Sequence, residues 1–307
     1  MSRKRLVISS GDPAGCGPVI TAGAIQDLRV PGVDLIVVGD KKVFLSLPSC
    51  KKFFKKVTFV DVGTAQIGVL KKGEASRLSG QAALNYINRS LDIISGKRAA
   101  LVTAPVSKEA ICLVHKDFSG HTEYLSNFFK SKNVAMMMVS PSFKTVLFSR
   151  HIPLSKVSGQ IKEEALLRAF KLIYQELKNK FNLPNPCVAC ASLNPHAGMN
   201  TFLGREEKII LEAIKKCPYP MQGPLSADTI FVKESLKKYD CVISLYHDQG
   251  MIPFKLLAMK KGVNLTLGLP IIRTSPAHGV AYDVIRQGKA PFYSSMLEAM
   301  KLAIRLL

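Results

Sequence analysis

Three histidines of this chain each follow a short apolar run at the point where that run turns polar. They are His151 after TVLFS (145–149), His196 after CVACASL (187–193) and His247 after CVISLY (241–246). Neutral imidazole is a frequent ligand of catalytic divalent metals, which keep open positions for substrate oxygens. If the runs are parallel strands, their ends lie at the sheet edge where ligands bind. The three histidines therefore predict a metal centre, although each alone also suits an ordinary loop.

Two aspartates are candidates for orienting these rings. Asp248 directly follows His247, and Asp228 lies in PLSADTIF (224–231). A carboxylate that accepts a hydrogen bond from a ligating imidazole fixes the orientation of the ring. Asp228 also suits the N-terminal cap of a short helix, and both roles can hold together.

Five further polar residues predict a site for an anionic ligand. They are His121, Thr122, Lys255, Asn264 and Arg273. The first two stand at the predicted start of a helix, where free N–H groups can hold phosphate or carboxylate. The other three follow or lie beside predicted strands, and an arginine suits bidentate contact with an anion. Helix capping and surface exposure are the alternatives for each residue taken singly.

The glycine-rich segment SSGDPAGCGP (9–18) does not match a nucleotide-binding fingerprint. Its glycines fall at positions 11, 15 and 17, so the G-x-G-x-x-G spacing is not met, and no lysine follows as in a P-loop. A tight strand-to-helix turn is the better interpretation.

Short apolar runs alternate with longer amphipathic stretches along the chain. Strands are expected at 5–10, 33–39, 56–62, 99–104, 134–140, 145–149, 187–193, 241–246 and 262–268, and helices at 79–96, 162–181, 205–217 and 293–307. This alternation predicts an α/β fold with helices packed on a largely parallel sheet.

Length and charge narrow the class of protein. A chain of 307 residues exceeds the roughly 250 to 300 residues at which one core stops growing, so two domains are expected. The net charge is +21, but the basic residues are spread over the whole length and tryptophan is absent. Nucleic-acid binding usually needs a focused basic motif or a stacking platform, so we expect none. A positive field would still attract anionic substrates.

The apolar runs are too short for a membrane protein. No run approaches the roughly 18 to 20 apolar residues of a membrane helix, and the start lacks the apolar stretch of about 7 to 15 residues of a secretory signal. We therefore expect a cytoplasmic protein that does not enter the membrane. Its seven scattered cysteines suit reduced thiols.

Seven segments occur in the order typical of one enzyme family. They are GDPAGCGP, GHTEYL, RHIPL, LNPHAG, GPLSADTIF, YHDQGMIPFK and GLPIIRTSPAHG. The chain resembles the 4-hydroxythreonine-4-phosphate dehydrogenases over nearly its whole length. That family belongs to the wider group of isocitrate and isopropylmalate dehydrogenases.

The resemblance implies an architecture. It implies two α/β/α domains with mostly parallel sheets, an active site in the cleft between them, and a homodimer in which both subunits contribute metal ligands. We expect residues 1–120 plus 276–307 to form the first domain, with the cofactor loop. Residues 121–275 would form the second, with the metal and substrate residues.

The resemblance also assigns roles to residues. It places the metal ligands at His151, His196 and His247, and the substrate contacts at His121, Thr122, Lys255, Asn264 and Arg273. SPAHGVAYD (275–283) resembles the loop that meets the adenosine part of NAD, which implies cofactor contacts from His278 and Asp283. Lys255 and Asp248 are the catalytic candidates, with Lys255 as the base and a water on the metal as its alternative.

The family's reaction is the NAD(P)-linked oxidation of 4-phosphooxy-threonine at its 3-hydroxyl. The resulting 2-amino-3-oxo acid loses CO2 and gives 3-amino-2-oxopropyl phosphate for the biosynthesis of pyridoxal phosphate (vitamin B6). A divalent zinc, magnesium, manganese or cobalt ion would stabilise the negative charge that forms on the substrate oxygens. The alternatives are a related dehydrogenase acting on another 3-hydroxy acid or diol, and an acyl-phosphate transferase that needs no metal.

Three positions depart from the family pattern. Ala277 stands where the family usually has an acid, Met199 where it has a Glu, and VIRQG (284–288) where it has an AGKG-like turn. The first and third lie beside the expected cofactor loop, so they leave the choice between NAD and NADP open.

Overall fold

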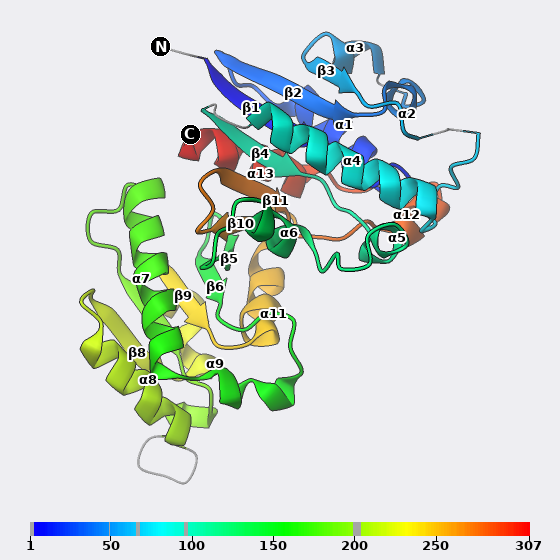
Figure 1. Ribbon diagram of the computed structural model, residues 1–307. Helices are drawn as coiled ribbons and strands as arrows, with labels where there is room; N and C mark the ends of the chain where they lie inside the picture. The colour runs from blue at the N-terminus through cyan, green and yellow to red at the C-terminus, as the bar shows by residue number, and fades with distance from the viewer. Residues whose placement is uncertain (1–2, 49, 66–67, 95–97, 199–203) are drawn as a thin grey trace. The chain divides into compact units, whose positions relative to one another are not determined.

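The computed structural model describes residues 3–48, 50–65, 68–94, 98–198 and 204–307. The chain forms two compact units. Unit 1 comprises residues 1–129 and 269–307, and unit 2 comprises residues 130–268. Both combine helices with mostly parallel strands, so the α/β fold class predicted from the alternating pattern is confirmed (Figure 1).

Unit 1 contains a parallel sheet with the strand order β3-β2-β1-β4-β11. Its strands are β1 (Lys4–Ser9), β2 (Val33–Gly39), β3 (Thr58–Asp61), β4 (Ala99–Thr103) and β11 (Ile272–Pro276). Every residue of the two strands β4 and β11 is buried. Parallel strands covered by helices on both faces are expected to be buried along their whole length in this way.

The helices of unit 1 cover both faces of its sheet. They are α1 (Gly17–Asp27), α2 (Lys41–Leu45), α3 (Cys50–Phe54), α4 (Arg77–Ile94), α5 (Lys108–Cys112), α6 (His121–Phe128), α12 (Tyr282–Arg286) and α13 (Ser294–Leu306). α4 lies across one face, and α1 and α13 lie against each other on the opposite face (Figure 1). The C-terminal helix α13 packs on β4 and β11, so both ends of the chain build this unit.

The unit borders lie at 129/130 and 268/269, whereas the sequence placed them at 120/121 and 275/276. The helix α6 belongs to unit 1 because Tyr124 donates a 2.6 Å hydrogen bond to Asn88 of α4. The strand β11 belongs there because it pairs with β4, for example Arg273 with Leu101. His121, Thr122 and Arg273 are therefore residues of unit 1 and not of the second unit.

The described part of unit 2 contains six strands in the order β10-β5-β6-β9-β7-β8. They are β5 (Ala135–Val139), β6 (Lys144–Leu147), β7 (Val188–Ala191), β8 (Met221–Leu225), β9 (Cys241–Ser244) and β10 (Val263–Leu267). The pairs β10–β5 and β5–β6 are antiparallel, whereas β6–β9, β9–β7 and β7–β8 are parallel. The carboxyl ends of β6, β9 and β7 therefore lie side by side.

Unit 2 has several helices, and one of them starts at the candidate metal ligand His247. They are α7 (Glu163–Lys180), α8 (Arg205–Lys216), α9 (Ala227–Ile230), α10 (Lys233–Leu236) and α11 (His247–Ala258), with short 3-10 turns η1 (Leu154–Lys156), η2 (Ser158–Gln160) and η3 (Pro195–Ala197). α11 packs on β6 and β9. His247 is its first residue, whereas the sequence indicated only a polar segment there.

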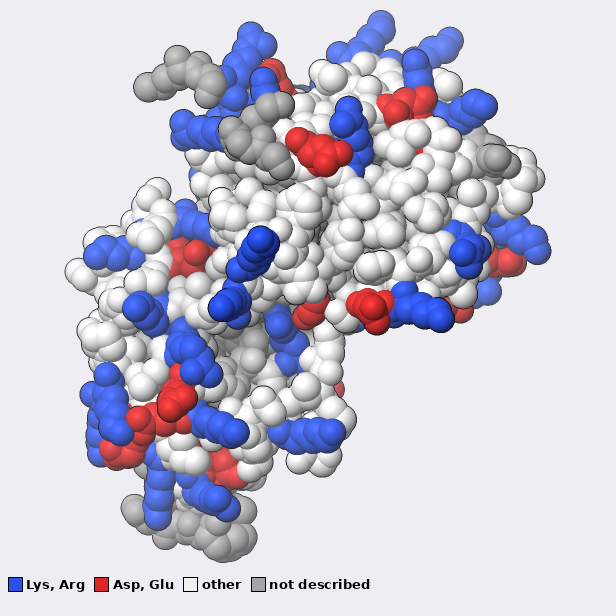
Figure 2. Space-filling model, viewed as in Figure 1, with Lys and Arg blue, Asp and Glu red and all other residues white. Residues whose placement is uncertain are grey.

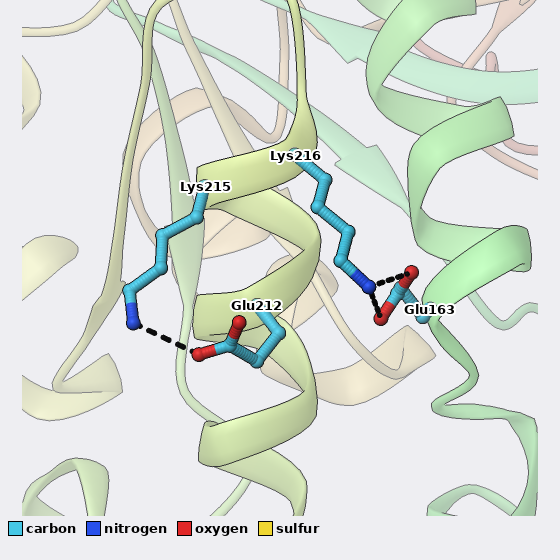
Figure 3. A network of polar contacts seen from close by, with 4 residues as sticks. All are labelled: Glu163, Glu212, Lys215 and Lys216. Carbon is cyan, nitrogen blue, oxygen red and sulfur yellow. Dashed lines mark hydrogen bonds and ion pairs between the residues drawn. The ribbon is translucent and has the colours of Figure 1, made fainter.

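Two exposed ion pairs involve α8: Lys216 with Glu163 connects it to α7, and Lys215 with Glu212 lies within α8. Lys216 Nζ lies 2.8 Å from both carboxylate oxygens of Glu163, and Lys215 Nζ lies 2.8 Å from Glu212 (Figure 3). Such solvated pairs stabilise a fold only weakly. Over the face shown in Figure 2, Lys and Arg are dispersed and do not form one patch. No helix of the described residues has the length and apolar character needed to cross a membrane.

Candidate active site

His151 and His247 lie close together at the carboxyl ends of two neighbouring strands. Their ring centroids are 6.0 Å apart, with a 41° angle between the ring planes. The pairing of β6 with β9 continues past both strands, since Phe148 N donates to Ser244 O (2.8 Å) and Ser149 N donates to Leu245 O (3.2 Å). Each histidine follows soon after this paired stretch. The pairing therefore brings together two imidazoles, His151 and His247, that are 96 residues apart in the chain.

Asp248 contacts the ring of His247. The distance between His247 Nδ1 and Asp248 Oδ1 is 2.6 Å, and the two side chains are 39 % and 70 % exposed. A carboxylate on Nδ1 favours the tautomer whose lone pair is on Nε2, the nitrogen that would then bind a cation. This is the arrangement that a ligating histidine needs.

His196 lies on η3 after β7, in an unusual backbone conformation. His196, Ala197 and Gly198 have φ values of 55°, 61° and 48°, so three successive residues are left-handed. His196 Nδ1 lies 3.7 Å from Asp228 Oδ2, and both side chains are largely exposed. The Ser226 hydroxyl donates to Asp228 Oδ1 (2.6 Å), and this hydrogen bond is the main reason why the pKa of Asp228 is lowered. Ser226, not Asp228, occupies the N-cap of α9.

Within the described residues, no three His, Cys, Asp or Glu side chains come close enough together to hold one ion. The pair His151 and His247 does suit a cation, because two imidazoles on one ion at about 2.1 Å have centroids up to roughly 6 Å apart. The structure thus brings together two of the three candidate ligands and leaves His196 outside that pair.

A half-buried imidazole whose Nε2 atom is buried and a buried guanidinium mark a second polar site, in unit 1. His121 is the first residue of α6, and its Nε2 atom is buried without a hydrogen-bond partner among the described residues. Burial, and to a lesser extent the charge of Arg273, lowers the pKa of His121 well below its ordinary value. Thr122 beside it is only 4 % exposed. A buried ring atom with no partner indicates that a ligand group completes this site.

Arg273, on β11, belongs to this site because its charge acts on the His121 ring. Its side chain is buried and donates from Nη2 to Thr103 Oγ1 (2.6 Å), and burial lowers its pKa to about 10. The charge of Glu123 acts against this effect and raises the pKa of Arg273. A guanidinium and a neighbouring imidazole together suit a phosphate or a carboxylate.

The other two substrate candidates belong to unit 2. Lys255 is exposed on α11, the helix that starts at His247. Asn264 is half-buried on β10, and its Oδ1 atom has no hydrogen-bond partner among the described residues. The expected substrate residues are thus divided between the units, three in unit 1 and two in unit 2.

The expected cofactor segment packs on the glycine-rich turn of residues 11–17. Tyr282 donates a 2.6 Å hydrogen bond to Asp12, and Cys16 N donates to Val280 O (2.9 Å). A Cβ atom on Gly15 would lie only 3.0 Å from Val280 O, which explains why glycine stands there. The turn therefore supports the cofactor segment by contact, a role that its sequence alone did not indicate.

His278 and Asp283 are both exposed on this segment. His278 Nδ1 lies 3.0 Å from Gly279 O, and Asp283 lies in the first turn of α12. Ala277, one of the departures from the family pattern, donates from its backbone N to Ser295 Oγ (2.9 Å). Met199, another departure from the family pattern, lies outside the described residues.

Comparison with solved structures identifies the class of protein. A structure of 4-hydroxythreonine-4-phosphate dehydrogenase from Klebsiella pneumoniae superposes with a TM-score of 0.84 at 29 % identity and covers 99 % of both chains. Isocitrate dehydrogenase from Methylococcus capsulatus, at 14 % identity and a TM-score of 0.50, shares the fold, with 99 % of this chain and 85 % of that one covered. The class is thus the α/β fold common to these dehydrogenases.

Sequence comparison identifies the family. The family model described as pyridoxal phosphate biosynthetic protein PdxA matches residues 29–303. The chain is 37 % identical to a 4-hydroxythreonine-4-phosphate dehydrogenase of Desulforapulum autotrophicum, over 98 % of this chain and 95 % of that protein. It is 35 % identical to a protein of Oceanobacillus iheyensis provisionally named D-threonate 4-phosphate dehydrogenase, over 100 % of this chain and 99 % of that protein. The chain belongs to the PdxA family, as the resemblance of its motifs predicted.

Proposed function

We propose that this protein is a 4-hydroxythreonine-4-phosphate dehydrogenase, which oxidises 4-phosphooxy-threonine with NAD or NADP. The product then loses CO2 to give 3-amino-2-oxopropyl phosphate. One observation carries the proposal: in a chain of the PdxA family, His151 and His247 meet at adjacent strand ends, and Asp248 lies against His247. In this proposal the enzyme acts in pyridoxal phosphate biosynthesis, in the cytoplasm.

The metal ligands in this proposal are His151, His196 and His247. One subunit supplies His151 and His247 to each metal, and the third ligand is His196 of the partner subunit. A divalent cation, when bound, would polarise the hydroxyl and carboxylate oxygens of the substrate. Imidazole ligands suit zinc best, and cobalt, manganese and magnesium are the other candidates.

The remaining residues bind the substrate and move its proton. Arg273, His121 and Thr122 hold the anionic groups, and Asn264 adds a hydrogen bond. Lys255 is the candidate that takes the proton of the 3-hydroxyl, and Asp248 holds the ring of His247. The nicotinamide accepts the hydride. His278 and Asp283 would contact the adenosine part of the cofactor from their exposed segment.

The incomplete metal site supports a homodimer. α11 starts at His247, and this helix together with its C-cap residue Met259 exposes Ile252, Leu256 and Met259, with 59 %, 81 % and 75 % of their surface accessible. These residues are spaced at i, i+4 and i+7 and so form one apolar stripe of the helix. A second copy of the chain is the occupant that would both cover the stripe and complete the metal site.

A second candidate function rests on the relative from Oceanobacillus iheyensis. Its name describes a phosphorylated dihydroxy acid in place of the phosphorylated amino acid. The same residues could bind either compound for oxidation by the nicotinamide, since both compounds carry a hydroxyl, a carboxylate and a phosphate.

The direct test is an assay of NADH or NADPH formation from purified protein with a substrate panel. The panel contains 4-phosphooxy-threonine, D-threonate 4-phosphate and their unphosphorylated counterparts. Turnover that prefers 4-phosphooxy-threonine supports the proposal, and preference for D-threonate 4-phosphate supports the second candidate. Equal turnover without the phosphate would contradict both, and full activity after chelation of metals would contradict the metal site.

A further inference from the structure

We propose that Gln249 is a positioning residue that sets the spacing between the histidine segments. This inference rests on the proposed metal site. Gln249 lies in the first turn of α11, two residues after His247, and its side chain is only 9 % exposed. Its Oε1 atom accepts from Leu245 N (2.7 Å), and its Nε2 atom donates to Ser192 O (2.7 Å). One amide thus joins the end of β9 to the end of β7.

The same network reaches the segment of His151. Ser149, two residues before His151, donates from its hydroxyl to Leu245 O (2.6 Å) and from its backbone N to the same oxygen (3.2 Å). Both polar groups of the Leu245 backbone are therefore engaged, one by Gln249 and the other by Ser149. A shift of Leu245 would move the His151 and His247 segments together.

The network also reaches the segment of His196. The Ser192 hydroxyl donates to Asn194 O (3.0 Å). The carboxylate of Glu207 is fully buried and accepts from Leu193 N (2.9 Å), Asn194 N (2.8 Å) and Asn194 Nδ2 (2.9 Å). The left-handed backbone at His196 is disfavoured for a residue with a side chain, so its surroundings must hold it.

An amide is the group that this position requires. Leu245 N is a donor and Ser192 O is an acceptor, and both residues are 0 % exposed. Buried backbone groups must be paired, and a primary amide offers an acceptor and a donor in one side chain. An apolar side chain of similar length would leave both backbone groups without partners, and the ends of β7 and β9 could then separate.

A purely structural role would have different consequences. In that case the loss of the amide lowers the stability of unit 2 but leaves metal binding unchanged as long as the chain is folded. In the positioning role, the folded variant binds the ion more weakly and in altered geometry. Cobalt separates the two roles, because its visible absorption reports ligand number and geometry without any turnover.

The test compares full-length wild-type protein with Gln249→Met. Cobalt(II) is titrated into each metal-free protein, the visible spectrum is recorded, and thermal unfolding of the metal-free proteins is followed by circular dichroism. We expect Gln249→Met to bind cobalt about 10- to 100-fold more weakly, with a changed spectrum, the range typical of lost support to metal ligands. Glu207→Gln, which keeps the size of the side chain, should show a smaller effect of the same kind.

Two controls on α7 separate positioning from general effects. Gln175→Met removes an exposed glutamine whose Nε2 atom lies 3.3 Å from the Tyr219 hydroxyl. Leu177→Ala removes a buried side chain of unit 2 and lowers stability away from the strand ends. Both should bind cobalt like the wild type.

Wild-type affinity and spectrum in Gln249→Met would overturn the inference, and so would equal weakening in Leu177→Ala at a similar loss of thermal stability. If Gln249→Met does not fold, Glu207→Gln decides in the same comparison. Absence of cobalt binding in the wild type would instead contradict the proposed metal site itself.

Discussion

The rings of His151 and His247 lie 6.0 Å apart at the ends of two parallel strands, and Asp248 contacts the second ring at 2.6 Å. The strand pairing that brings the two rings together is a property of the fold, whereas the aspartate is a local addition. Separate predictions follow for the ring, for its carboxylate and for the anion site of unit 1.

Asp248→Asn is expected to weaken metal binding without unfolding the protein. The amide keeps the shape of the side chain but loses the charge that holds the His247 ring, so affinity should fall about 10- to 100-fold. Isothermal titration with zinc measures this. The matched control is Asp92→Asn, which removes an exposed aspartate 3.8 Å from Arg89 on α4 and should leave zinc binding unchanged. Unaltered affinity in Asp248→Asn would show that the carboxylate has no part in the site.

Arg273→Lys should impair use of the phosphorylated substrate. A lysine retains the charge but lacks the planar pair of donors that match an anion. We expect kcat/KM for the substrate to fall at least about 100-fold, which corresponds to roughly 2.7 kcal/mol, while KM for the nicotinamide changes little. Arg89→Lys on the surface of α4 is the control. Equal losses for substrate and cofactor would point to a general disturbance of unit 1 instead.

Acid should destabilise the protein through His121. Its pKa in the folded state is lowered by burial, so below the ordinary value near 6.5 the unfolded chain binds a proton that the folded chain does not. The contribution of His121 to stability is therefore fully present above that pH and is lost as the pH falls. One such group changes the free energy of unfolding by at most about 1.4 kcal/mol per pH unit.

His121→Asn, which cannot take up this proton, is the comparison for that prediction. Urea unfolding at pH 7.5, 6.5, 5.5 and 5.0 should show a steeper loss of stability in the wild type than in the variant. Parallel curves for the two proteins would mean that His121 is protonated equally in the folded and unfolded chains.

Leu256→Lys should prevent dimer formation. Leu256 lies in the centre of the exposed apolar stripe of α11, and a buried lysine at a symmetric contact would meet its own copy. Light scattering should give the mass of a dimer for the wild type, near twice 33.6 kDa, and that of one chain for the variant. The single-chain variant should also lose high-affinity metal binding. A wild type that stays a single chain at micromolar concentration would contradict the shared site.

The positions of the histidines were accessible from sequence because each follows a recognisable apolar strand. The helix α11 could not be predicted from the sequence, because HDQGMIPFK contains Gly250 and Pro253, which oppose a helix in isolation. The structure gives the reason for the glycine: a Cβ atom there would lie 2.5 Å from Ser244 Oγ and 2.7 Å from Leu147 Cδ2. Close packing of the helix on β6 and β9 outweighs local propensity.

Other features depend on contacts between distant parts of the chain. The strand β11 follows Pro270 and ends at Pro276, and it forms because β4 is available to pair with it. The antiparallel pairing of β5 with β10 likewise follows from neighbours in space. Gln249 and Ser192 are 57 residues apart, so no local pattern indicates their hydrogen bond. Sequence periodicity predicts elements, whereas buried polar networks require the assembled fold.

The most direct test of the proposed metal centre is the metal content of purified wild-type protein and of the single variants His151→Ala, His196→Ala and His247→Ala. His115→Ala, which removes an exposed histidine of unit 1, serves as the control. Elemental analysis after dialysis should find one divalent ion per chain in the wild type and the control, and strong depletion in each of the three variants. Full metal content in the folded His196→Ala protein would contradict the three-histidine centre.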